Sequence, residues 1–441
     1  MGTHFLVKNI KEPIDWTVEV PGSKSMTNRA LLLAALSDGT VELSGVLFSD
    51  DSRHFLSCLT ALGFAVECDE EKKCAAVCGC GGKIPKKQAV INVGSAGTAA
   101  RFLTALLGFS DGVYTIDASE QMKKRPMREL FSLLAAAGAK ITCLEEEGHL
   151  PVRVRGAGCG AAAEGKPAEF SLDISASTQF LSALLLISPM IRQGLAVRIT
   201  SEKKDGSYIR ITRNMMREFG VPVSFDGECY RVERGAVYRK KSYAVEPDMS
   251  AACYFYGAAA ITGGTALVRQ VHPDNTQGDR KFLAVLAQMG CEVRDTADGI
   301  AVRGPARGKL RGISLDMNDF SDQALTLAAL APFADGPVHI ANIGHIRGQE
   351  CDRIHAIAAE LSRAGIRVDE EPDGVTIYPG WPQSCVIETY GDHRVAMAFS
   401  LLGLRAEGIS IADPGCCAKT FENYFELLDA LCGRQAGCAE E

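Results

Sequence analysis

The stretch "VPGSKSMTNRALLLAALSDGT", residues 20–40, contains a glycine turn, a short polar segment and then a long apolar run. Lys24 and Arg29 lie beside Ser25 and Asn28 where the apolar run is expected to begin a helix. Cations are costly to bury unless acceptors or an anion meet them. Two cations at the mouth of an apolar helix therefore indicate an anion-binding site.

The same kind of segment occurs six times along the chain, which indicates a repeat architecture. Each copy has a small polar start with Ser, Thr or Asp at an N-cap position, an Ala/Leu-rich helix, a glycine and a β-rich stretch. The other copies are "SAGTAARFLTALLGFSDGV", "SASTQFLSALLLISPMIRQGLAV", "DMSAACYFYGAAAITGGTALV", "FSDQALTLAALAPFADGPVHI" and "GDHRVAMAFSLLGLRAEGISI". The closing glycines, about 70 to 80 residues apart, are Gly39, Gly112, Gly194, Gly264, Gly336 and Gly408.

A second helix type lies between the copies, as in "SRHFLSCLTALGFAVE" and "RKFLAVLAQMGCEVR". Its apolar residues recur at i, i+3, i+4 and i+7, and a glycine follows at the helix C′ position. The first helix type is apolar all round and should be buried, while the second should face solvent. The chain is therefore expected to form an α/β fold of six units, divided three and three by a seam near Pro247.

The bulk composition excludes several classes of protein. With 441 residues, 46 % apolar and 23 % charged, the chain should form ordered cores, most simply in two domains. A net charge of −7 argues against general binding to nucleic acid or membrane surfaces. We expect no signal peptide and no membrane span, because the apolar runs are shorter than the roughly 18 residues a span needs. These features predict a cytoplasmic protein.

Sixteen scattered cysteines favour reduced thiols in a cytoplasmic setting. Cys74, Cys78 and Cys80 could be a fragment of a zinc site, but no fourth ligand follows at a usual spacing. The segment also has the pattern of a strand and turn. We therefore expect no metal.

Cations recur in loops beside Gly, Ser and Thr rather than on exposed helix faces. Any single one could be a solvated surface charge, but the set favours an anionic ligand. "GSKS" lacks the spacing of a P-loop, so a nucleoside triphosphate is not implied. The set comprises Lys24, Arg29, Arg101, Lys123, Lys124, Arg125, Arg347, Arg353, Arg394 and Lys419.

Together, these motifs resemble the 5-enolpyruvylshikimate-3-phosphate (EPSP) synthases, also called 3-phosphoshikimate 1-carboxyvinyltransferases. The resemblance runs over nearly the whole chain, in the family's order. The UDP-N-acetylglucosamine enolpyruvyl transferases share the six-unit fold, but this sequence has neither their opening motif nor their cysteine loop. The matching motifs are "VPGSKSMTNRALLLAALSDG", "SAGTAARFL", "KKRPM", "SASTQFLSALLL", "QGD", "CDRIHA", "GDHRVAMAFSLLGL" and "CCAKTFENYF".

The resemblance implies a fold and an activity. The fold is α/β, with two similar domains of three repeat units each, described as an inside-out α/β barrel. One domain would be discontinuous, residues 1–22 plus 247–441, and the other would be residues 23–246. The enolpyruvyl group of phosphoenolpyruvate would pass to the 5-hydroxyl of shikimate 3-phosphate, with release of phosphate, on the pathway to chorismate and aromatic amino acids. No cofactor is implied, and we expect a monomer whose partners are its two small substrates.

The resemblance also implies site residues. Catalysis would fall to Lys24, Asp322 and Glu350, with the two carboxylates serving as base and acid. Shikimate 3-phosphate would contact Lys24, Ser25, Arg29, Ser177, Thr178, Gln179, Asp322 and Gln349. Phosphoenolpyruvate would contact Lys24, Gly97, Arg125, Gln179, Arg353, Arg394 and Lys419.

The chain departs from the family pattern on the acceptor side. Gln349 stands where a lysine is common, His345 where an asparagine is frequent, and Ser95 replaces another asparagine. Asp205 falls where a phosphate-binding serine is usual, although a gapped alignment could offer Ser207 instead. His345 could supply part of the missing positive charge or simply pack against its loop. Two alternatives therefore stay open: a related transferase with another anionic acceptor, and an inactive anion-binding homologue.

Overall fold

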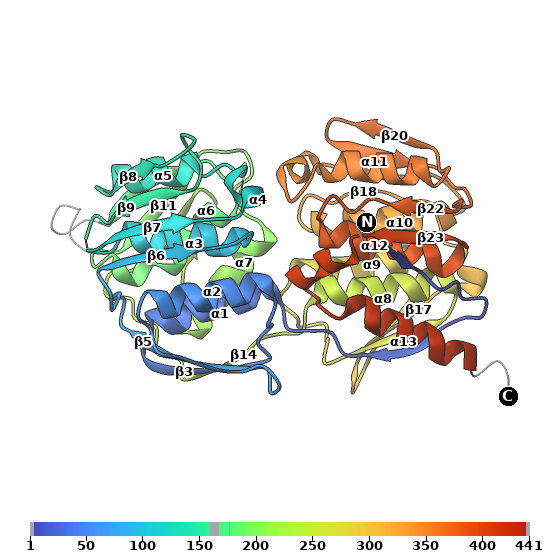
Figure 1. Cartoon of the computed structure of the whole chain (residues 1–441), viewed down its shortest axis with the longest axis horizontal. Helices are drawn as coiled ribbons and strands as arrows, with labels where there is room; N and C mark the ends of the chain where they lie inside the picture. The colour runs from blue at the N-terminus through green and yellow to red at the C-terminus, as the bar shows by residue number, and fades with distance from the viewer. Residues whose placement is uncertain (1–3, 159–166, 176, 438–441) are drawn as a thin grey trace. The chain divides into compact units, whose positions relative to one another are not determined.

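The computed structural model describes residues 4–158, 167–175 and 177–437. The chain divides into two compact units (Figure 1). Unit 1 is Met1–Pro21 with Pro247–Glu441, and unit 2 is Gly22–Glu246. Each unit has its own hydrophobic core.

Three buried helices pack against one another in the middle of each unit, as apolar helices without a polar face should. In unit 2 they are α1 (Lys24–Leu36), α3 (Gly97–Gly108) and α6 (Gln179–Leu186). In unit 1 they are α8 (Met249–Thr262), α10 (Ala324–Leu330) and α12 (His393–Arg405).

The second helix type lies outside these bundles with one face buried. Its members are α2 (Asp50–Ala61), α5 (Arg128–Ala136), α7 (Ser207–Glu218), α9 (Phe282–Gln288), α11 (Arg353–Arg363) and α13 (Tyr424–Gly437). Short helical turns complete the set: α4 (Glu120–Lys123), η1 (Ser188–Met190), η2 (Gly278–Lys281), η3 (Ala306–Gly308), η4 (Ser321–Gln323), η5 (Ala331–Phe333), η6 (Gly344–Gly348) and η7 (Pro414–Lys419).

The described strands form six open sheets, five with four strands in the same topology and one with three strands. In each sheet one pair of neighbouring strands runs parallel. The other neighbouring strands pair antiparallel. The strand orders in unit 2 are β14-β3-β5-β4, β6-β7-β9-β8 and β10-β11-β13-β12. Those in unit 1 are β16-β17-β15-β2, β18-β19-β21-β20 and β1-β23-β22. The sheets pack on the outside of the central helices, and none of the described sheets closes into a barrel.

The β-rich stretches predicted at the six closing glycines all form strands, and further strands complete the sheets. Unit 2 contains β3 (Asp38–Ser44), β4 (Val66–Asp69), β5 (Cys74–Cys80), β6 (Gln88–Asn92), β7 (Val113–Asp117), β8 (Lys140–Cys143), β9 (Val152–Arg155), β10 (Ala168–Leu172), β11 (Leu195–Ile199), β12 (Ser224–Phe225), β13 (Cys229–Val232) and β14 (Ser242–Ala244). Unit 1 contains β1 (His4–Leu6), β2 (Asp15–Val18), β15 (Thr265–Arg269), β16 (Glu292–Thr296), β17 (Gly299–Arg303), β18 (Ser314–Asp316), β19 (Val338–Ala341), β20 (Val368–Glu371), β21 (Gly374–Ile377), β22 (Cys385–Ile387) and β23 (Ile409–Ala412).

Strand pairing explains why the chain crosses between the units twice. The N-terminal strand β1 pairs antiparallel with β23, and β2 pairs parallel with β15, so both belong to sheets of unit 1. The last strand of unit 2, β14, returns to pair parallel with β3. The first residues of the chain thus complete sheets whose other strands come from the C-terminal half.

The glycines predicted after the outer helices have the expected backbone conformation. Each adopts a positive φ, between 76° and 105°, that residues with a side chain rarely adopt. These glycines are Gly63, Gly138, Gly220, Gly290 and Gly365.

The predicted residue types, Ser, Thr or Asp, stand at the N-cap of four inner helices, whereas α3 and α10 have Ala96 and Gln323 there. Asp248 and Asp392 do accept a backbone N–H with their side chains, at α8 and α12. At α1, α3, α6 and α10 no side chain of the N-cap residue makes a capping hydrogen bond. The polar side chains there bond to neighbouring helices instead, as Asn28 does to Thr98 at 2.6 Å. These helix ends therefore keep N–H groups that the cap side chain does not occupy.

Three further observations concern the described residues. Their cysteines are all free thiols, including Cys74, Cys78 and Cys80 in and around the exposed face of β5. Their His, Cys, Asp and Glu side chains form no group of three or more suited to a metal ion. Their helices are all too short or too polar to cross a bilayer.

Candidate active site

The inner helices of unit 2 begin at the same end of the unit. Asn28 Nδ2 of α1 donates to Thr98 Oγ1 in the first turn of α3. Arg29 Nη2, one residue on, donates to Ser182 Oγ in the first turn of α6, at 3.4 Å. Three positive helix-dipole ends therefore meet where the predicted cations lie.

Arg29 is a buried cation that contacts neutral groups. It is 1 % exposed, and its Nε donates to Thr212 Oγ1 and its Nη1 to the Ser25 carbonyl, both at 2.8 Å. Its guanidinium also lies 5.2 Å from the ring centroid of Phe102. Burial lowers the pKa of Arg29 to about 10, which leaves it charged at neutral pH. The hydrogen bonds it donates within the described chain end on uncharged oxygens, so its positive charge favours an anionic ligand nearby.

Lys24 has a carboxylate partner that the sequence did not predict. Lys24 Nζ lies 3.3 Å from Oδ2 of Asp51, which is in the first turn of α2 and only 2 % exposed. The other oxygen of Asp51 is buried and has no hydrogen-bond partner within the described residues. The polar start of α2 was visible in "SDDS", but nothing local indicates that this turn faces Lys24.

Gly97 provides space for two guanidinium groups. A Cβ at this position would lie 2.7 Å from Arg125 Nη1 and 2.8 Å from Arg101 Nη1. Arg101 is 3 % exposed and donates to the Gly97 carbonyl at 3.2 Å. The structure therefore brings Arg125 to the start of α3, as expected, and adds Arg101 beside it.

The segment Ser177–Gln179 forms the start of α6. Ser177 Oγ accepts the backbone N–H of Gln179 at 3.2 Å, and Thr178 is the N-cap residue. The side-chain oxygen Oε1 of Gln179 is buried without a hydrogen-bond partner in the described chain. A buried acceptor of this kind is costly unless a donor reaches it.

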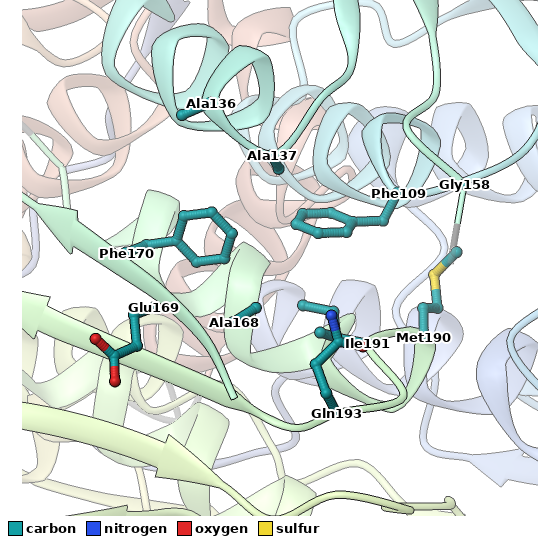
Figure 2. A pocket seen from close by; sticks show the side chains of 10 residues that line it. All are labelled: Phe109, Ala136, Ala137, Gly158, Ala168, Glu169, Phe170, Met190, Ile191 and Gln193. Atoms are coloured by element: carbon teal, nitrogen blue, oxygen red, sulfur yellow. The ribbon is translucent and has the colours of Figure 1, made fainter. Parts of the chain in front are cut away.

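A cavity of about 140 Å³ at the other end of α3 has a different character. Figure 2 shows the Phe109 and Phe170 rings across it, and their centroids lie 6.2 Å apart. Its lining within the described residues contains no Lys or Arg, and Glu169 and Gln193 add polar groups at its wall. Since Phe109 follows the C-terminal end of α3, this apolar cavity is separate from the cations at the helix start.

Unit 1 holds a cluster of ion pairs centred on Arg353, which is 1 % exposed. Arg353 Nη1 contacts Asp322 Oδ1 and its Nη2 contacts Glu350 Oε2, both at 2.9 Å, while its Nε contacts Asp392 Oδ2 at 2.8 Å. Burial opposes the charge of Arg353, but the carboxylates of Asp392, Glu350 and Asp322 outweigh it and raise the pKa of the guanidinium. Arg353 thus holds three carboxylates at once.

Asp322 and Glu350 each bridge two cations. The second oxygen of Asp322 contacts Arg394 Nη2 at 3.0 Å, and the second oxygen of Glu350 lies 3.3 Å from Lys419 Nζ. The Asp322 and Glu350 side chains are 14 % and 9 % exposed. The two predicted catalytic carboxylates therefore lie together, with three predicted cations, in a largely dehydrated setting.

Asp392 was predicted as an N-cap residue but not as part of the site. It is fully buried, and its Oδ1 accepts the backbone N–H of Arg394 at 2.9 Å while its other oxygen binds Arg353. It therefore caps α12 and orients Arg353 at the same time. The sequence predicted its role as a cap, but not its contact with Arg353.

Two of the residues that depart from the family pattern, His345 and Asp205, make hydrogen bonds within the fold. His345 Nε2 lies 2.8 Å from Ser321 Oγ, directly before Asp322. Asp205 accepts from Arg210 at 2.9 Å and from the Tyr230 hydroxyl at 3.0 Å. Gln349 follows η6 and precedes Glu350. His345 thus packs against the Asp322 turn.

Comparisons with known proteins decide the family. A family model described as EPSP synthase (3-phosphoshikimate 1-carboxyvinyltransferase) matches residues 8–428. A relative from Nostoc punctiforme named 3-phosphoshikimate 1-carboxyvinyltransferase is 43 % identical over 417 residues, which cover 94 % of this chain and 96 % of the relative. The chain belongs to the EPSP synthase family.

Solved structures agree with this assignment. An EPSP synthase from Acinetobacter baumannii superposes with a TM-score of 0.79 at 25 % identity, covering 98 % of both chains. The enolpyruvyl transferase NikO from Streptomyces tendae has a TM-score of 0.75 at 16 % identity and covers 98 % of both chains. The predicted family and α/β fold are confirmed. Because NikO shares the fold, the acceptor must be argued from side chains.

Proposed function

We propose that this EPSP synthase family member transfers the enolpyruvyl group of phosphoenolpyruvate to the 5-hydroxyl of shikimate 3-phosphate and releases phosphate. The observation that carries the proposal is the pair Asp322 and Glu350, each held by two cations and mostly shielded from water. Relatives that match over nearly their whole length carry the name of this activity. The product would lead to chorismate and the aromatic amino acids.

The cations act on phosphoenolpyruvate in this proposal. Arg353 and Arg394 present planar donors that suit a carboxylate or phosphate, while Lys24 and Lys419 supply point charges. Both arginines bind carboxylates within the chain, so an anion would exchange with or join an existing ion pair. The residues proposed to bind phosphoenolpyruvate are Lys24, Gly97, Arg125, Gln179, Arg353, Arg394 and Lys419.

Shikimate 3-phosphate contacts both neutral polar groups and cations in this proposal. Gln179 Oε1 is buried and has no hydrogen-bond partner among the described residues, so it can accept from a ring hydroxyl. Arg29 adds positive charge beside Ser25, whose carbonyl it orients. The proposed acceptor residues are Lys24, Ser25, Arg29, Ser177, Thr178, Gln179, Asp322 and Gln349.

The two carboxyl groups divide the proton transfers. A carboxylate accepts the proton of the 5-hydroxyl while the hydroxyl oxygen forms a bond to C2 of phosphoenolpyruvate. A carboxylic acid protonates C3, and the product of this step is a tetrahedral adduct. In the second step the C2–O bond to phosphate breaks and C3 loses a proton. The C2–C3 double bond forms again, and the product is an enol ether. Asp322 and Glu350 serve as this pair, with Lys24 stabilising the transferred charge.

Phosphate release from phosphoenolpyruvate, with and without shikimate 3-phosphate, tests the proposal. Release that requires shikimate 3-phosphate supports it. Release only with another phosphorylated or carboxylated alcohol would indicate a different acceptor, as Gln349 and Asp205 permit. No release with any acceptor would indicate an anion-binding homologue.

The proposal extends to the organisation of the enzyme. We propose that residues 1–22 with 247–441 and residues 23–246 are its two domains, and that it works as a cytoplasmic monomer. Light scattering after gel filtration should give the mass of one chain, 47.1 kDa. A mass twice as large would contradict the monomer.

Arg125→Ala should raise the KM for phosphoenolpyruvate about tenfold or more, because a charge-assisted contact is worth roughly 1.5–3 kcal/mol. Lys124→Ala is the matched control, since it removes an exposed cation from the same loop. Steady-state kinetics with shikimate 3-phosphate saturating measure the effect. Equal KM values for the two variants would remove Arg125 from the site.

Gln349→Lys should tighten shikimate 3-phosphate binding, because it restores a charge where Gln349 can offer only a neutral hydrogen bond. A gain of about 1–2 kcal/mol corresponds to a roughly five- to thirtyfold lower KM. Gln349→Met controls for side-chain length without charge. The gain should shrink as salt is added. A gain of the same size for Gln349→Met would mean that charge is not the cause.

A further inference from the structure

Asp279 is a buried carboxyl group of unit 1 that the proposed reaction does not use. It lies in η2, inside the "QGD" motif, and is 8 % exposed. Its Oδ2 accepts from the Ser250 hydroxyl and from Gln323 Nε2, the latter at 3.0 Å. Both donors lie next to residues of the proposed active site.

One route from Asp279 leads to Arg394. Ser250 Oγ donates to Asp279 and accepts from Arg394 Nη2 at 3.4 Å. The same Nη2 atom donates to Asp322 Oδ2 at 3.0 Å. Ser250 therefore links the Asp279 carboxyl to the guanidinium that contacts Asp322.

The other route passes through the peptide chain. Gln323 directly follows Asp322 in η4 and is completely buried. Thr326 Oγ1 donates to Gln323 Oε1 at 3.0 Å, so the amide presents its Nε2 to Asp279. Moving or neutralising Asp279 would act on the turn that carries Asp322.

Charge couples the two aspartates as well. Burial and then the negative charge of Asp322 raise the pKa of Asp279 to about 6, against the opposing effect of Arg394 and the two hydrogen bonds. The Cys253 thiol also lies beside Asp279: it donates to the Asp279 carbonyl, and the Asp279 charge adds to burial in raising the pKa of this thiol. Through Asp322 the coupling extends to Arg353, and from there to Glu350 and Asp392. Asp279 thus changes charge near pH 6, beside a catalytic carboxylate.

We propose that Asp279 is a positioning residue for the reaction: through Gln323 and Ser250 it holds the Asp322 carboxylate and the Arg394 guanidinium in place, and its ionisation adds a negative charge behind them. The inference rests on the proposed function, because it presumes that Asp322 and Arg394 meet the substrates. Asp279 itself contacts neither substrate in this scheme.

Asp279→Asn tests the inference, because it keeps the shape of the side chain and removes its ionisation. The kcat/KM of wild type and variant are measured from pH 5 to 9, and their ratio cancels the ionisation of the substrate phosphates near pH 6. The ratio should show a step near pH 6, with a kcat change larger than the change in either KM. Asp274→Asn, an exposed aspartate of the preceding loop, should give a flat ratio.

A second readout does not depend on activity. The carboxyl ¹³C signal of Asp322, assigned with Asp322→Asn, should show a step near pH 6 in wild type that Asp279→Asn abolishes. A wild type that releases no phosphate would sink the proposed function, while this titration would still decide whether Asp279 acts on Asp322. An unchanged titration with a flat activity ratio would overturn the inference.

Ser250→Ala covers the case in which Asp279→Asn does not fold. It leaves Asp279 in place and removes the hydroxyl that joins Asp279 to Arg394. The KM for phosphoenolpyruvate should therefore rise about threefold or more. The KM for shikimate 3-phosphate should stay within about twofold, because the Gln323 route to Asp322 is intact. Unchanged KM values for both substrates would overturn the positioning of Arg394 by Asp279.

Discussion

Glu350→Gln should lower kcat about a hundredfold or more, because general acid–base groups typically contribute 10² to 10⁴ in rate. The amide has almost the shape of the carboxyl but can neither accept nor deliver a proton in the reaction. Glu350 suits this role physically, since Arg353 and Lys419 hold its two oxygens at 2.9 and 3.3 Å. The carboxyl therefore has a defined orientation before substrate arrives.

Steady-state kinetics with both substrates saturating measure this effect, and circular dichroism confirms that the variant is folded. Glu292→Gln provides the control, because Glu292 forms an exposed ion pair with Arg294 in the same unit. It should leave kcat within about twofold, as expected for an exposed charge. If Glu350→Gln keeps kcat within a few-fold of wild type, Glu350 is not an acid–base residue.

Arg353→Met should lower the free energy of unfolding by about 3–5 kcal/mol, the usual cost of removing one partner from a buried ionic cluster. Methionine fills much of the volume but leaves Asp322, Glu350 and Asp392 without their shared cation. Arg394 and Lys419 still contact Asp322 and Glu350, whereas fully buried Asp392 loses its main ionic partner. Most of the loss should therefore come from Asp392.

Urea unfolding at pH 7.5 measures the loss, and Arg294→Met is the matched control. Arg294 is largely exposed, so breaking its ion pair should cost less than about 1 kcal/mol. The double variant Arg353→Met with Asp392→Asn should regain part of the stability, because it no longer buries the unpaired carboxylate of Asp392. A loss for Arg353→Met no larger than that of the control would show that the cluster adds little to folding.

The elements of the fold were predictable because their signals are local. Helical periodicity separated the buried helices from the amphipathic ones, and the glycines after the outer helices adopt the left-handed conformation that ends a helix. The predicted N-cap residue types are absent only at α3 and α10, but at α1 and α6 the side chains of Ser23 and Thr178 make no capping hydrogen bond, for a reason that is not local. Polar side chains at these ends, such as Asn28 and Thr98, bond across helices.

The candidate site was predictable residue by residue but not as an arrangement. Lys24, Arg29, Arg353, Arg394 and Lys419 stood out as cations in small-residue loops, and the family resemblance supplied Asp322 and Glu350. Their partners did not stand out. Asp51 and Asp392 look like ordinary first-turn or cap residues in the sequence, yet they neutralise Lys24 and Arg353.

The sequence by itself determined that the chain forms six α/β units, that its inner helices are buried, and that cations gather at their starts. These properties depend on residue type and on spacing within one turn or one strand. Only the tertiary structure decided that Arg353 holds three carboxylates from three segments, and that Asp279 lies behind Asp322. Apart from Glu350 and Arg353, which are 3 positions apart, these contacts join residues 31 to 44 positions apart in the chain. Their energies depend on burial and distance, which no local pattern specifies.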